Sequence, residues 1–419
     1  MNRKTIALPG LPDIDITPIL PIIDHQLFQR MRYRHQLGTS FFVFPAANHT
    51  RYEHSLGTFA LTGERTRLWL NDGIITEEQA VNLKLFGLLH DIGHGPFSHA
   101  TEPLCRKSHE AYGAFLLSRM GKAIEKCGGS IDQLRCFFLR TDPLHCCVTH
   151  RPLGTDKIDY LTRDARWTTE SVGLRRGDLL NHVSYLAGQL SVDVKIMAEA
   201  IKAQSDYIYM HDRVYLRKAC VIIQRFLQQI VARLLAAQEI TPGQLACMTD
   251  FELMAALVNT RQSEIAALFQ RLVERNLPKT AIQLMPAGVM THDRLDSKAI
   301  KVYEMSEERL QRFEHFCHPE AANAAEAAIA SMLGIPPEAI LVVPIATPER
   351  FVPEDILLND GSLPRGLLRE ARPAHYTSLV EIARSYATVR ICVFKEYRRS
   401  VAFSDLTSRI IKLLEDSMP

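Results

Sequence analysis

The stretch LKLFGLLHDIGHGPFSHATE, residues 83–102, constrains this chain more than any other, because metal-capable side chains directly follow a run of leucines. The apolar run predicts a helix packed in a core, and the Gly-Pro pair after it predicts the end of that helix. Neighbouring helical residues lie about 100° apart and residues four apart share a face, so His90, Asp91 and His94 fall in one sector. A carboxylate removed from water is costly unless it is paired, protonated or bound to a cation. Metal binding is therefore the first function to test.

A single histidine on an apolar helix face is more often a satisfied core residue than a metal ligand. Residues 90–109, however, contain four histidines and one aspartate. So many ligand-type groups at one helix end favour a functional site over several independent core residues.

Composition is that of an ordinary folded protein, with 47% of the 419 residues hydrophobic and 23% charged. The formal net charge of +2 is too small to predict general binding to nucleic acid or to a membrane surface. The nine cysteines are an odd set without CxxC spacing, which is typical of reduced thiols rather than of disulfides or a zinc–cysteine site. The opening residues are too broken by Pro and Asp for a signal peptide, and no apolar run approaches the roughly 18 residues that span a bilayer. We therefore expect a cytoplasmic protein.

Apolar residues at three- and four-residue spacing predict helices through most of the first 290 residues. The clearest predicted helices cover residues 24–37, 77–94, 155–167, 213–238 and 263–275. Later in the chain, short β-branched runs at 339–345 and 389–395 predict strands, and the alanine-rich run 321–333 predicts a helix. The predicted fold is mainly α, with a helical core domain over residues 1–290 and a smaller C-terminal α+β accessory region over 291–419.

Two further motifs carry polar side chains that suit the same chemistry. TRYEHSLGT holds His54 close to Arg51, and its glycine indicates close packing of the helix that the motif opens. GTDKIDYLTRDA places Asp156, Tyr160 and Asp164 on one helix face at four-residue spacing. Taken alone, His54 is uninformative, and the second motif can equally be a solvated charged face.

Together the three segments resemble a known family. The order His54, His90-Asp91 and Asp156 is similar to the metal-binding signature of the HD-domain phosphohydrolases. The longer runs RYEHSLG, LLHDIGHGPFSH and DKIDYLTRD resemble the deoxynucleoside triphosphate triphosphohydrolase (dNTPase) branch of that family. The resemblance implies a helical HD-domain core in which these four residues bind a divalent metal ion. Two imidazoles and two carboxylates suit Mn, Fe, Ni, Zn or Mg, and ligand type alone does not choose among these ions.

The resemblance also implies an activity, the hydrolysis of dNTPs to deoxynucleoside and intact triphosphate by attack of a metal-activated water on the α-phosphorus. The departing 5′-oxygen needs a proton, and a histidine is the usual donor near neutral pH. His99 matches the proton donor of the family, and Glu102 matches the carboxylate that orients it. His94 and His109 match positions that contact the phosphates, although His109 can also be a plain histidine at a helix start.

A triphosphate needs cations in its binding site. Arg51, Lys157 and the segment around His211 and Arg213 match phosphate-contacting positions, although each can be an ordinary surface charge. Tyr207 stands roughly where the human enzyme of the family has an arginine, which puts one phosphate contact in doubt.

The sugar contacts follow from the resemblance alone. The residues that match Gln36, Leu37 and Tyr215 pack around deoxyribose in the family, and the match of Asp164 binds the 3′-hydroxyl. Leu216 replaces a base-contacting Gln of some members, so base preference cannot be transferred. The predicted substrate-binding set is Gln36, Leu37, Arg51, Lys157, Tyr160, Asp164 and Tyr215.

Regulation is predicted on the same basis. Asp24, Gln29 and Arg32 match three residues that bind a guanine at an inter-subunit allosteric site in nucleotide-activated members. The family's DPIHG-type stretch is replaced here by LPDIDITPILP, so a structural network at a helix end is the alternative. Members commonly assemble through these helices, and the resemblance therefore also predicts a homo-oligomer.

Two other functions stay open at this point. The first is an HD phosphodiesterase or phosphatase that acts on another nucleotide, against which Gln36, His99, Asp164 and Tyr215 favour the dNTPase. The second is a non-catalytic nucleotide sensor or single-strand nucleic-acid binder. The intact ligand set, the small net charge and the presence of only two tryptophans argue against it.

Overall fold

The computed structural model describes residues 3–169, 173–289, 300–345, 347–361, 363–402 and 405–418. The chain forms two compact units. The first unit comprises Met1–Met210, Ala246–Phe251 and Pro353–Thr377, and the second comprises His211–Leu245, Glu252–Val352 and Ser378–Pro419. The chain therefore passes between the units several times and not once near residue 290, because segments distant in sequence pair within each unit. The division into an enzymatic domain at 1–290 and an accessory region at 291–419 stays a prediction.

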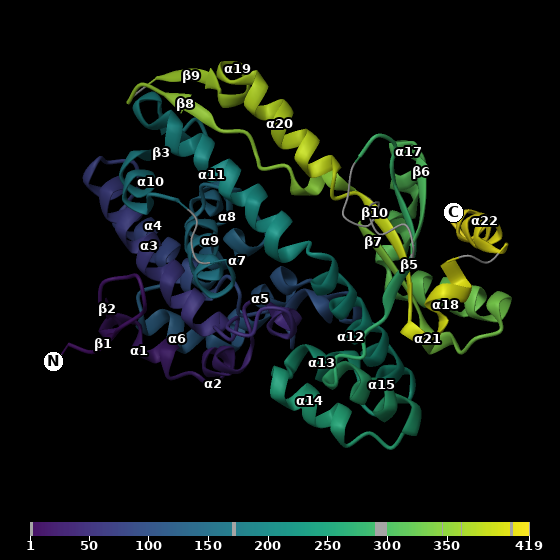
Figure 1. The fold of residues 1–419 in the computed structure, drawn as a ribbon. Helices are drawn as coiled ribbons and strands as arrows, with labels where there is room; N and C mark the ends of the chain where they lie inside the picture. Colours follow the sequence, from purple (N-terminus) through teal and green to yellow (C-terminus); the bar gives the residue numbers. More distant parts are fainter. Residues whose placement is uncertain are drawn as a thin grey trace. The chain divides into compact units, whose positions relative to one another are not determined.

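Three helices organise the first unit (Figure 1): α3 (Arg51–Asn71) packs along α4 (Glu77–Leu89) and α9 (Thr155–Thr168). Thr76 begins α4 with a capping box, in which its hydroxyl accepts from the Gln79 backbone and the Gln79 side chain accepts in return. The surrounding helices are α5 (His109–Leu117), α6 (Gly121–Lys126), α7 (Ile131–Phe138), α8 (Cys146–Thr149), α10 (Arg176–His182) and α11 (Met197–Met210).

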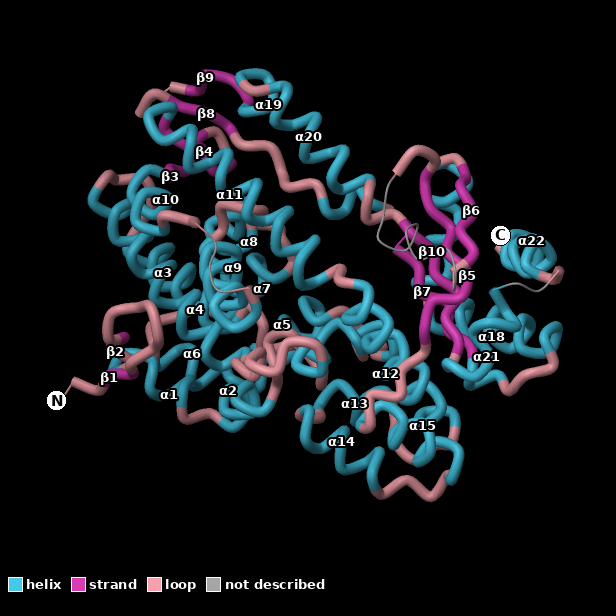
Figure 2. The backbone as a smooth tube through the Cα atoms, viewed as in Figure 1, coloured by secondary structure: helices cyan, strands magenta, loops and turns pink. Residues whose placement is uncertain are grey.

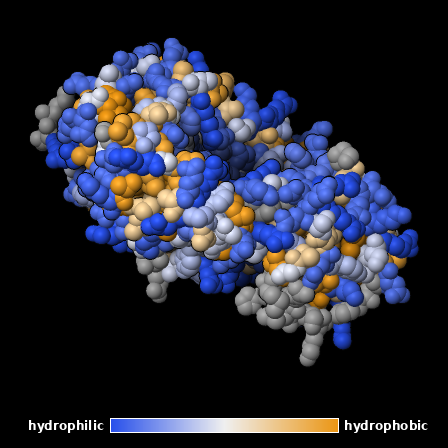
Figure 3. Space-filling view, turned by 90° about the horizontal axis from the view of Figure 1, so that it is seen from above, coloured by the Kyte–Doolittle hydropathy of each residue, from blue (hydrophilic) through white to orange (hydrophobic). Residues whose placement is uncertain are grey.

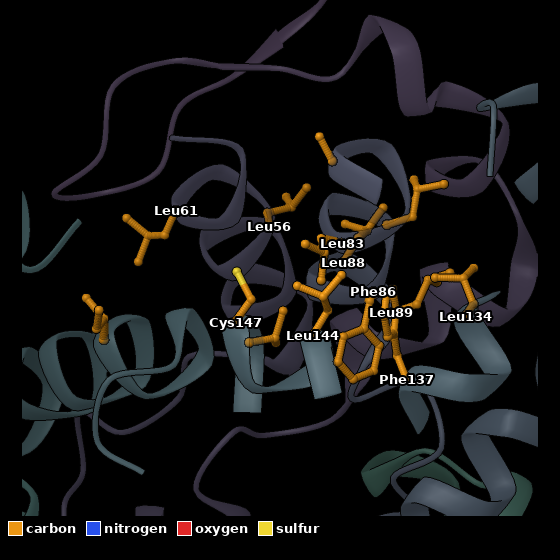
Figure 4. Packing of buried hydrophobic residues seen from close by; sticks show 14 of the residues in the cluster. Leu56, Leu61, Leu83, Phe86, Leu88, Leu89, Leu134, Phe137, Leu144 and Cys147 are labelled. Carbon is orange, nitrogen blue, oxygen red and sulfur yellow. The ribbon is translucent and has the colours of Figure 1, made fainter. Parts of the chain in front are cut away.

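Leucine and phenylalanine side chains from these helices form the core of the first unit. Figure 4 shows Leu56 of α3, Leu88 of α4 and Phe137 of α7 within this cluster, and all three side chains are fully buried. The core therefore joins the helix that leads into HDIGH to the helix that carries TRYEHSLG.

Two small sheets complete the first unit (Figure 2). β1 (Thr5–Ile6) pairs antiparallel with β2 (Ile14–Asp15). The second sheet has the order β3-β4-β8-β9, and β8 joins it parallel to β4. Its strands are β3 (Val183–Leu186), β4 (Gln189–Asp193), β8 (Leu357–Asn359) and β9 (Pro364–Leu367). This pairing is the reason why Pro353–Thr377 belongs to the first unit.

The second unit is built on a four-stranded mixed sheet with the order β6-β5-β10-β7. Its strands are β5 (Lys279–Pro286), β6 (Lys301–Met305), β7 (Ile340–Ile345) and β10 (Thr388–Val393). The helix α18 (Pro319–Leu333) packs against β7, and α22 (Thr407–Asp416) packs against α18. The predicted strands at 339–345 and 389–395, the predicted helix at 321–333 and the mainly α fold class are therefore confirmed.

Among the described residues, one helix, α12 (Lys218–Ala236), is long and apolar enough to cross a membrane. The sequence analysis expected no apolar run of this length, and the charged residues Arg225 and Arg233 interrupt the run in this helix. Most of this helix is buried in the protein, and its Arg225 donates to Oε1 of the buried Glu326 at 2.7 Å. The core helix of a soluble protein can have the same length and composition as a membrane-spanning helix. On the face of the molecule shown in Figure 3, most side chains are hydrophilic. This helix is weak evidence for a membrane span.

The helix predicted over residues 24–37 is wrong beyond its middle. α2 (Gln26–Gln29) continues as a 3-10 turn over Arg30–Tyr33, and Arg34 then has extended backbone angles. The Arg34 guanidinium is buried on the backbone carbonyls of Ala246, Cys247 and Met248, and the Gln36 amide donates to the His49 carbonyl. These contacts replace the bonds that a continued helix would make.

We predict that Phe137→Ala lowers the free energy of unfolding by about 3–5 kcal/mol, because it opens a cavity in the fully buried cluster of the first unit. The matched control is Phe115→Ala, in which the same side chain is removed from a position that is 45% exposed. Urea denaturation followed by circular dichroism measures both. Equal losses for the two variants would contradict the assigned core.

Candidate active site

Three helices bring the predicted metal ligands together in the first unit. His54 lies in the first turn of α3, His90 follows the last residue of α4 and precedes Asp91, and Asp156 lies in the first turn of α9. Nε2 of His54 lies 3.3 Å from Nε2 of His90, 3.2 Å from Oδ1 of Asp156 and 3.8 Å from Oδ2 of Asp91. Nε2 of His90 lies 3.5 Å from Oδ1 of Asp91. These four buried residues form one group, here called the His-Asp cluster.

Hydrogen bonds on the far side of each imidazole aim its Nε2 atom into the cluster. Nδ1 of His54 donates to Oδ2 of Asp159 at 2.8 Å, and Nδ1 of His90 donates to the Gly87 carbonyl at 2.9 Å. Metal-binding histidines in proteins are almost always held in this way, which fixes both the ring orientation and the tautomer. The donor set therefore fits a divalent cation, and its function as a metal site stays a prediction.

Asp159, which holds the His54 ring, was missed by the sequence analysis. Its carboxylate also accepts from Arg163, at 2.9 Å from Nε and 2.8 Å from Nη2. A Cβ on Gly57 would lie 2.1 Å from Oδ1 of Asp159, so α9 can approach α3 only where α3 has glycine. The position of Asp159 inside the DKIDYLTRD motif, together with Gly57 three residues after His54, was the available signal.

Neighbouring charges and hydrogen bonds shift the pKa values of the groups in the His-Asp cluster. Burial raises the pKa of the Asp156 carboxyl, but the charge of Lys157 and bonds from both imidazoles hold that pKa well below its ordinary value. Burial lowers the pKa of His54, but its bonds to Asp156 and Asp159 outweigh this effect and raise the pKa to about 10. A proton therefore lies on His54 at neutral pH, between carboxylates where a divalent ion would compete for the same place.

Two predicted phosphate-binding cations contact the carboxylates of this cluster. Arg51 is buried, forms an ion pair with Asp91 and donates from Nε to Oγ of Ser98 at 2.8 Å. Nζ of Lys157 lies 2.5 Å from Oδ2 of Asp156 and 5.2 Å from the centre of the Tyr160 ring. Both cations therefore lie beside the carboxylates of the proposed metal site.

The predicted catalytic residues form a second group, the His-Glu cluster, made of His94, His99, Glu102 and His109. Glu102 accepts from Nδ1 of His99 at 3.0 Å through one oxygen and from Nδ1 of His109 at 2.7 Å through the other. The rings of His94 and His109 stack with centroids 3.9 Å apart. Glu102 therefore orients two histidines, where the sequence analysis assigned it one.

Close packing and charge shape the His-Glu cluster. A Cβ on Gly93 would lie 2.0 Å from the His109 carbonyl oxygen, so glycine is needed where α5 meets the end of α4. Burial lowers the pKa of His109, but the hydrogen bond and charge of Glu102 raise it above its ordinary value. Burial and the charges of Arg51 and His109 lower the pKa of His94 well below its ordinary value, so His94 is neutral.

The predicted sugar contacts lie partly in the first unit. Gln36 and Leu37 are half-buried, and among the described atoms Oε1 of Gln36 is buried and has no hydrogen-bond partner. Oδ1 of Asp164 accepts from Nε2 of the buried His49 at 2.7 Å, a partner that the sequence analysis missed. Tyr215 belongs to the second unit, where the π-helical turn His211–Tyr215 also holds Arg213.

The predicted allosteric residues form a helix-end network. Oε1 of Gln29 accepts from Nε of Arg32 at 2.8 Å, and the Gln29 amide donates to the Ile23 carbonyl at 2.7 Å. The Arg32 guanidinium lies 3.6 Å from the centre of the Tyr52 ring, while Asp24 is exposed. This arrangement is the alternative that the sequence analysis left open, and guanine binding stays a prediction.

Comparison with known families identifies the chain. Residues 51–143 match the HD domain, and residues 179–413, more than half of the chain, match the HD associated region. The chain belongs to the HD-domain family. The predicted family is thereby confirmed, and this HD protein carries both of its ligand-type clusters within or directly around the matched HD domain.

Curated relatives support the resemblance over part of the chain. An uncharacterized protein of Methanocaldococcus jannaschii is 30% identical over 268 residues, 63% of this chain and 56% of that protein. The deoxynucleoside triphosphate triphosphohydrolase SAMHD1 of Gallus gallus is 34% identical over 194 residues, 36% of this chain and 32% of that enzyme. Human SAMHD1 is 43% identical over 107 residues, 23% of this chain and 16% of that enzyme. The alignments thus span about half of these relatives or less.

Two solved structures share the fold. A phosphohydrolase of Bacteroides thetaiotaomicron has a TM-score of 0.71 and 23% identity, covering 94% of this chain and 100% of the other. A hypothetical protein of Aquifex aeolicus has a TM-score of 0.68 and 21% identity, covering 99% and 100%. At these identities the likeness concerns the fold alone.

We predict that Gly57→Ala weakens Mn²⁺ binding about 10- to 100-fold, because the added methyl displaces Asp159 from His54. Gly63→Ala in the same helix is the matched control, since its Cβ would lie 3.5 Å from a flexible Lys84 side chain. Metal titration measures the affinity, and circular dichroism verifies the fold. Equal affinities in the two variants would show that the Asp159 contact does not orient His54.

Metal binding should depend on pH because the raised pKa of His54 leaves that imidazole protonated near neutrality. A metal ion needs the neutral ring, so binding releases a proton and the apparent Mn²⁺ affinity rises about tenfold per pH unit for each proton released. Calorimetry in two buffers of different ionisation enthalpy counts the released protons. Binding that is independent of pH, with no proton released, would contradict this assignment.

Proposed function

We propose that this HD protein hydrolyses dNTPs to a deoxynucleoside and triphosphate in a reaction that depends on a divalent metal ion. The observation that carries the proposal is the adjacency of the two clusters: Nε2 of His94 lies 3.3 Å from Oδ1 of Asp91. Groups suited to a cation and groups suited to proton transfer therefore lie side by side. The similarity of residues around both clusters to deoxynucleoside triphosphate triphosphohydrolases supports the same substrate class.

The residues of the His-Asp cluster, His54, His90, Asp91 and Asp156, would hold the metal ion. Such an ion, when bound, supplies a water of lowered pKa and polarises a phosphoryl oxygen. The chain contributes two buried carboxylates and two imidazoles whose Nε2 atoms converge. The product analysis described below compares Mn, Fe, Ni, Zn and Mg and identifies which of these ions supports the reaction.

His99 is the proposed general acid. Its side chain is 64% exposed while its Nδ1 atom is held by Glu102, so its Nε2 atom is free to meet a substrate oxygen. In the proposed step, water attacks the α-phosphorus and loses one proton to solvent, the bond from that phosphorus to the 5′-oxygen breaks, and His99 gives its own proton to that oxygen. Glu102 holds Nδ1 of His99 at 3.0 Å and so orients the ring for the transfer.

The phosphate chain is proposed to lie against His94, His109, Arg51 and Lys157. Arg51 and Lys157 hold their positions through carboxylates and can share their remaining donors with phosphate oxygens. The neutral His94 and the Glu102-bound His109 add hydrogen-bond donors without excess charge. Two cations together with two further hydrogen-bond donors suit a substrate that carries several negative charges.

The sugar is proposed to lie near Gln36, Leu37, Tyr160 and Asp164 of the first unit, and the sugar contact of Tyr215 stays a prediction from the family resemblance. Oε1 of Gln36 is buried and has no hydrogen-bond partner among the described atoms, and a sugar hydroxyl can donate to it. Specificity for deoxyribose follows if the site leaves no room for a 2′-hydroxyl.

We also propose a guanine-nucleotide activator at Asp24, Gln29 and Arg32, a homo-oligomer and a cytoplasmic location. The nine free thiols agree with a cytoplasmic location.

Product analysis tests this proposal. The protein is incubated with each dNTP and NTP and with Mn²⁺, Mg²⁺, Fe²⁺, Ni²⁺ or Zn²⁺, in ¹⁸O-labelled water, with and without GTP. We expect deoxynucleoside and intact triphosphate on anion-exchange chromatography, with the label in the triphosphate because water attacks phosphorus. His90→Ala and Asp91→Ala should abolish the products, since each removes a ligand-type group. Orthophosphate or a nucleoside monophosphate as product would instead identify a phosphatase or phosphodiesterase, and inactivity with every ion and activator would favour a nucleotide sensor.

A further inference from the structure

The turn that carries His99 has an unusual backbone. Phe97 and Ser98 both have left-handed backbone angles, with φ of 51° and 52°. Successive non-glycine residues rarely adopt this conformation, and it persists where the surrounding structure enforces it. Because these two residues immediately precede His99, whatever holds them also places the imidazole.

Three side chains hold the turn. Arg51 donates from Nε to Oγ of Ser98 at 2.8 Å, and Oγ1 of Thr101 donates to the Pro96 carbonyl at 2.5 Å. The third is Asp250, whose Oδ1 accepts from the Phe97 amide at 2.7 Å although it lies 153 residues further along the chain. Of these three side chains, Asp250 alone lies outside the sequence motifs quoted above.

The second oxygen of Asp250 holds the segment that carries the proposed sugar contacts. Oδ2 accepts from the His35 amide at 2.8 Å and from Nδ1 of His35 at 2.7 Å. Gly38, three residues later, packs so closely on the turn that a Cβ there would lie 2.8 Å from the Phe97 carbonyl oxygen. One carboxylate, only 1% exposed, therefore fixes the His99 turn and the Gln36-Leu37 segment to each other.

Arg34 fixes the segment that carries Asp250. Its fully buried guanidinium donates to the carbonyls of Ala246, Cys247 and Met248, at distances from 2.7 to 3.4 Å. These carbonyls lie at the end of α13 (Pro242–Cys247), where a cation is favourable. Between two segments of the second unit, the chain contributes the short segment Ala246–Phe251 to the first unit. The Arg34 hydrogen bonds hold this segment in place.

We propose that Asp250 is a positioning residue that fixes the His99 turn relative to the sugar-contacting segment. This inference rests on the proposed function only for the role of His99 as general acid. A displacement of about 1 Å in a catalytic group can cost about 100-fold in rate. Asp250 acts through the backbone of Phe97 and touches no reacting atom.

The first test uses leaving groups that differ in their need for a proton. A deoxynucleoside leaves as a poor alkoxide unless His99 protonates it, whereas p-nitrophenolate leaves without a proton. We expect Asp250→Ala to lower kcat on a dNTP about 100-fold with little change in bound metal, and to raise KM because Asp250 also holds the sugar-contacting segment. Hydrolysis of bis(p-nitrophenyl) phosphate should change little. Equal losses on both substrates would show a merely structural role and overturn the proposal.

Further variants sharpen the test. Asp250→Asn keeps one acceptor oxygen and should lose part of the activity. A double variant with His99→Ala should be no slower on a dNTP than His99→Ala alone, because Asp250 acts through His99. The matched control is Asp142→Asn, which alters another aspartate that accepts through both oxygens, from Leu144 and Gln133, away from the turn. Independent losses from Asp250→Ala and His99→Ala, multiplying in the double variant, would overturn the proposal.

Hydrogen exchange separates this proposal from the proposed function. In Asp250→Ala, amides of residues 97–101 should exchange faster while those of α3 and α9 keep their protection. This readout needs no turnover, so it decides the positioning role even if the wild-type protein releases no triphosphate from any dNTP. Unchanged protection of the turn in a folded Asp250→Ala protein would overturn the inference.

Discussion

The hydrogen bond between Nδ1 of His54 and Asp159 is the contact on which the site depends. It orients the imidazole at the centre of the His-Asp cluster, whose Nε2 atom meets His90, Asp91 and Asp156. The bond forms because Gly57 lets α9 approach α3. A side chain at position 57 would separate α3 from α9, which supply two of the four residues of the His-Asp cluster. The close packing of these two helices therefore also sets the geometry of the cluster.

Charge pairing makes this burial possible. Three buried aspartates lie in or beside the His-Asp cluster, and an unpaired carboxylate in such surroundings would be strongly destabilising. Each has its own cation, in the pairs Asp91–Arg51, Asp156–Lys157 and Asp159–Arg163. The third pair is structural, whereas the first two also lie where a phosphate would come. The same cations can therefore serve the folded protein and its proposed substrate, since a guanidinium or ammonium group has several donors.

Much of the site could be predicted because its residues repeat at helical spacing or follow one another in the chain. His90, Asp91 and His94 share a helix end, where His90 lies beside His54 and Asp156 and His94 lies beside Asp91. The mainly α fold and the late strands were predictable for the same reason, since hydrophobic periodicity is a local signal. The helix predicted to residue 37 failed at Arg34, whose buried contacts with residues 246–248 no local pattern reveals.

The sequence by itself determined that His90, Asp91 and His94 share one helix end, because they follow one another at helical spacing, and its resemblance to the HD-domain family predicted the metal-binding and proton-transfer roles. Tertiary structure alone decided which groups orient them. Asp159 meets His54 across 105 residues, His49 meets Asp164 across 115, and Asp250 meets Phe97 across 153. Helical periodicity places a side chain on a face, but only the packing of one helix against another decides what that face meets.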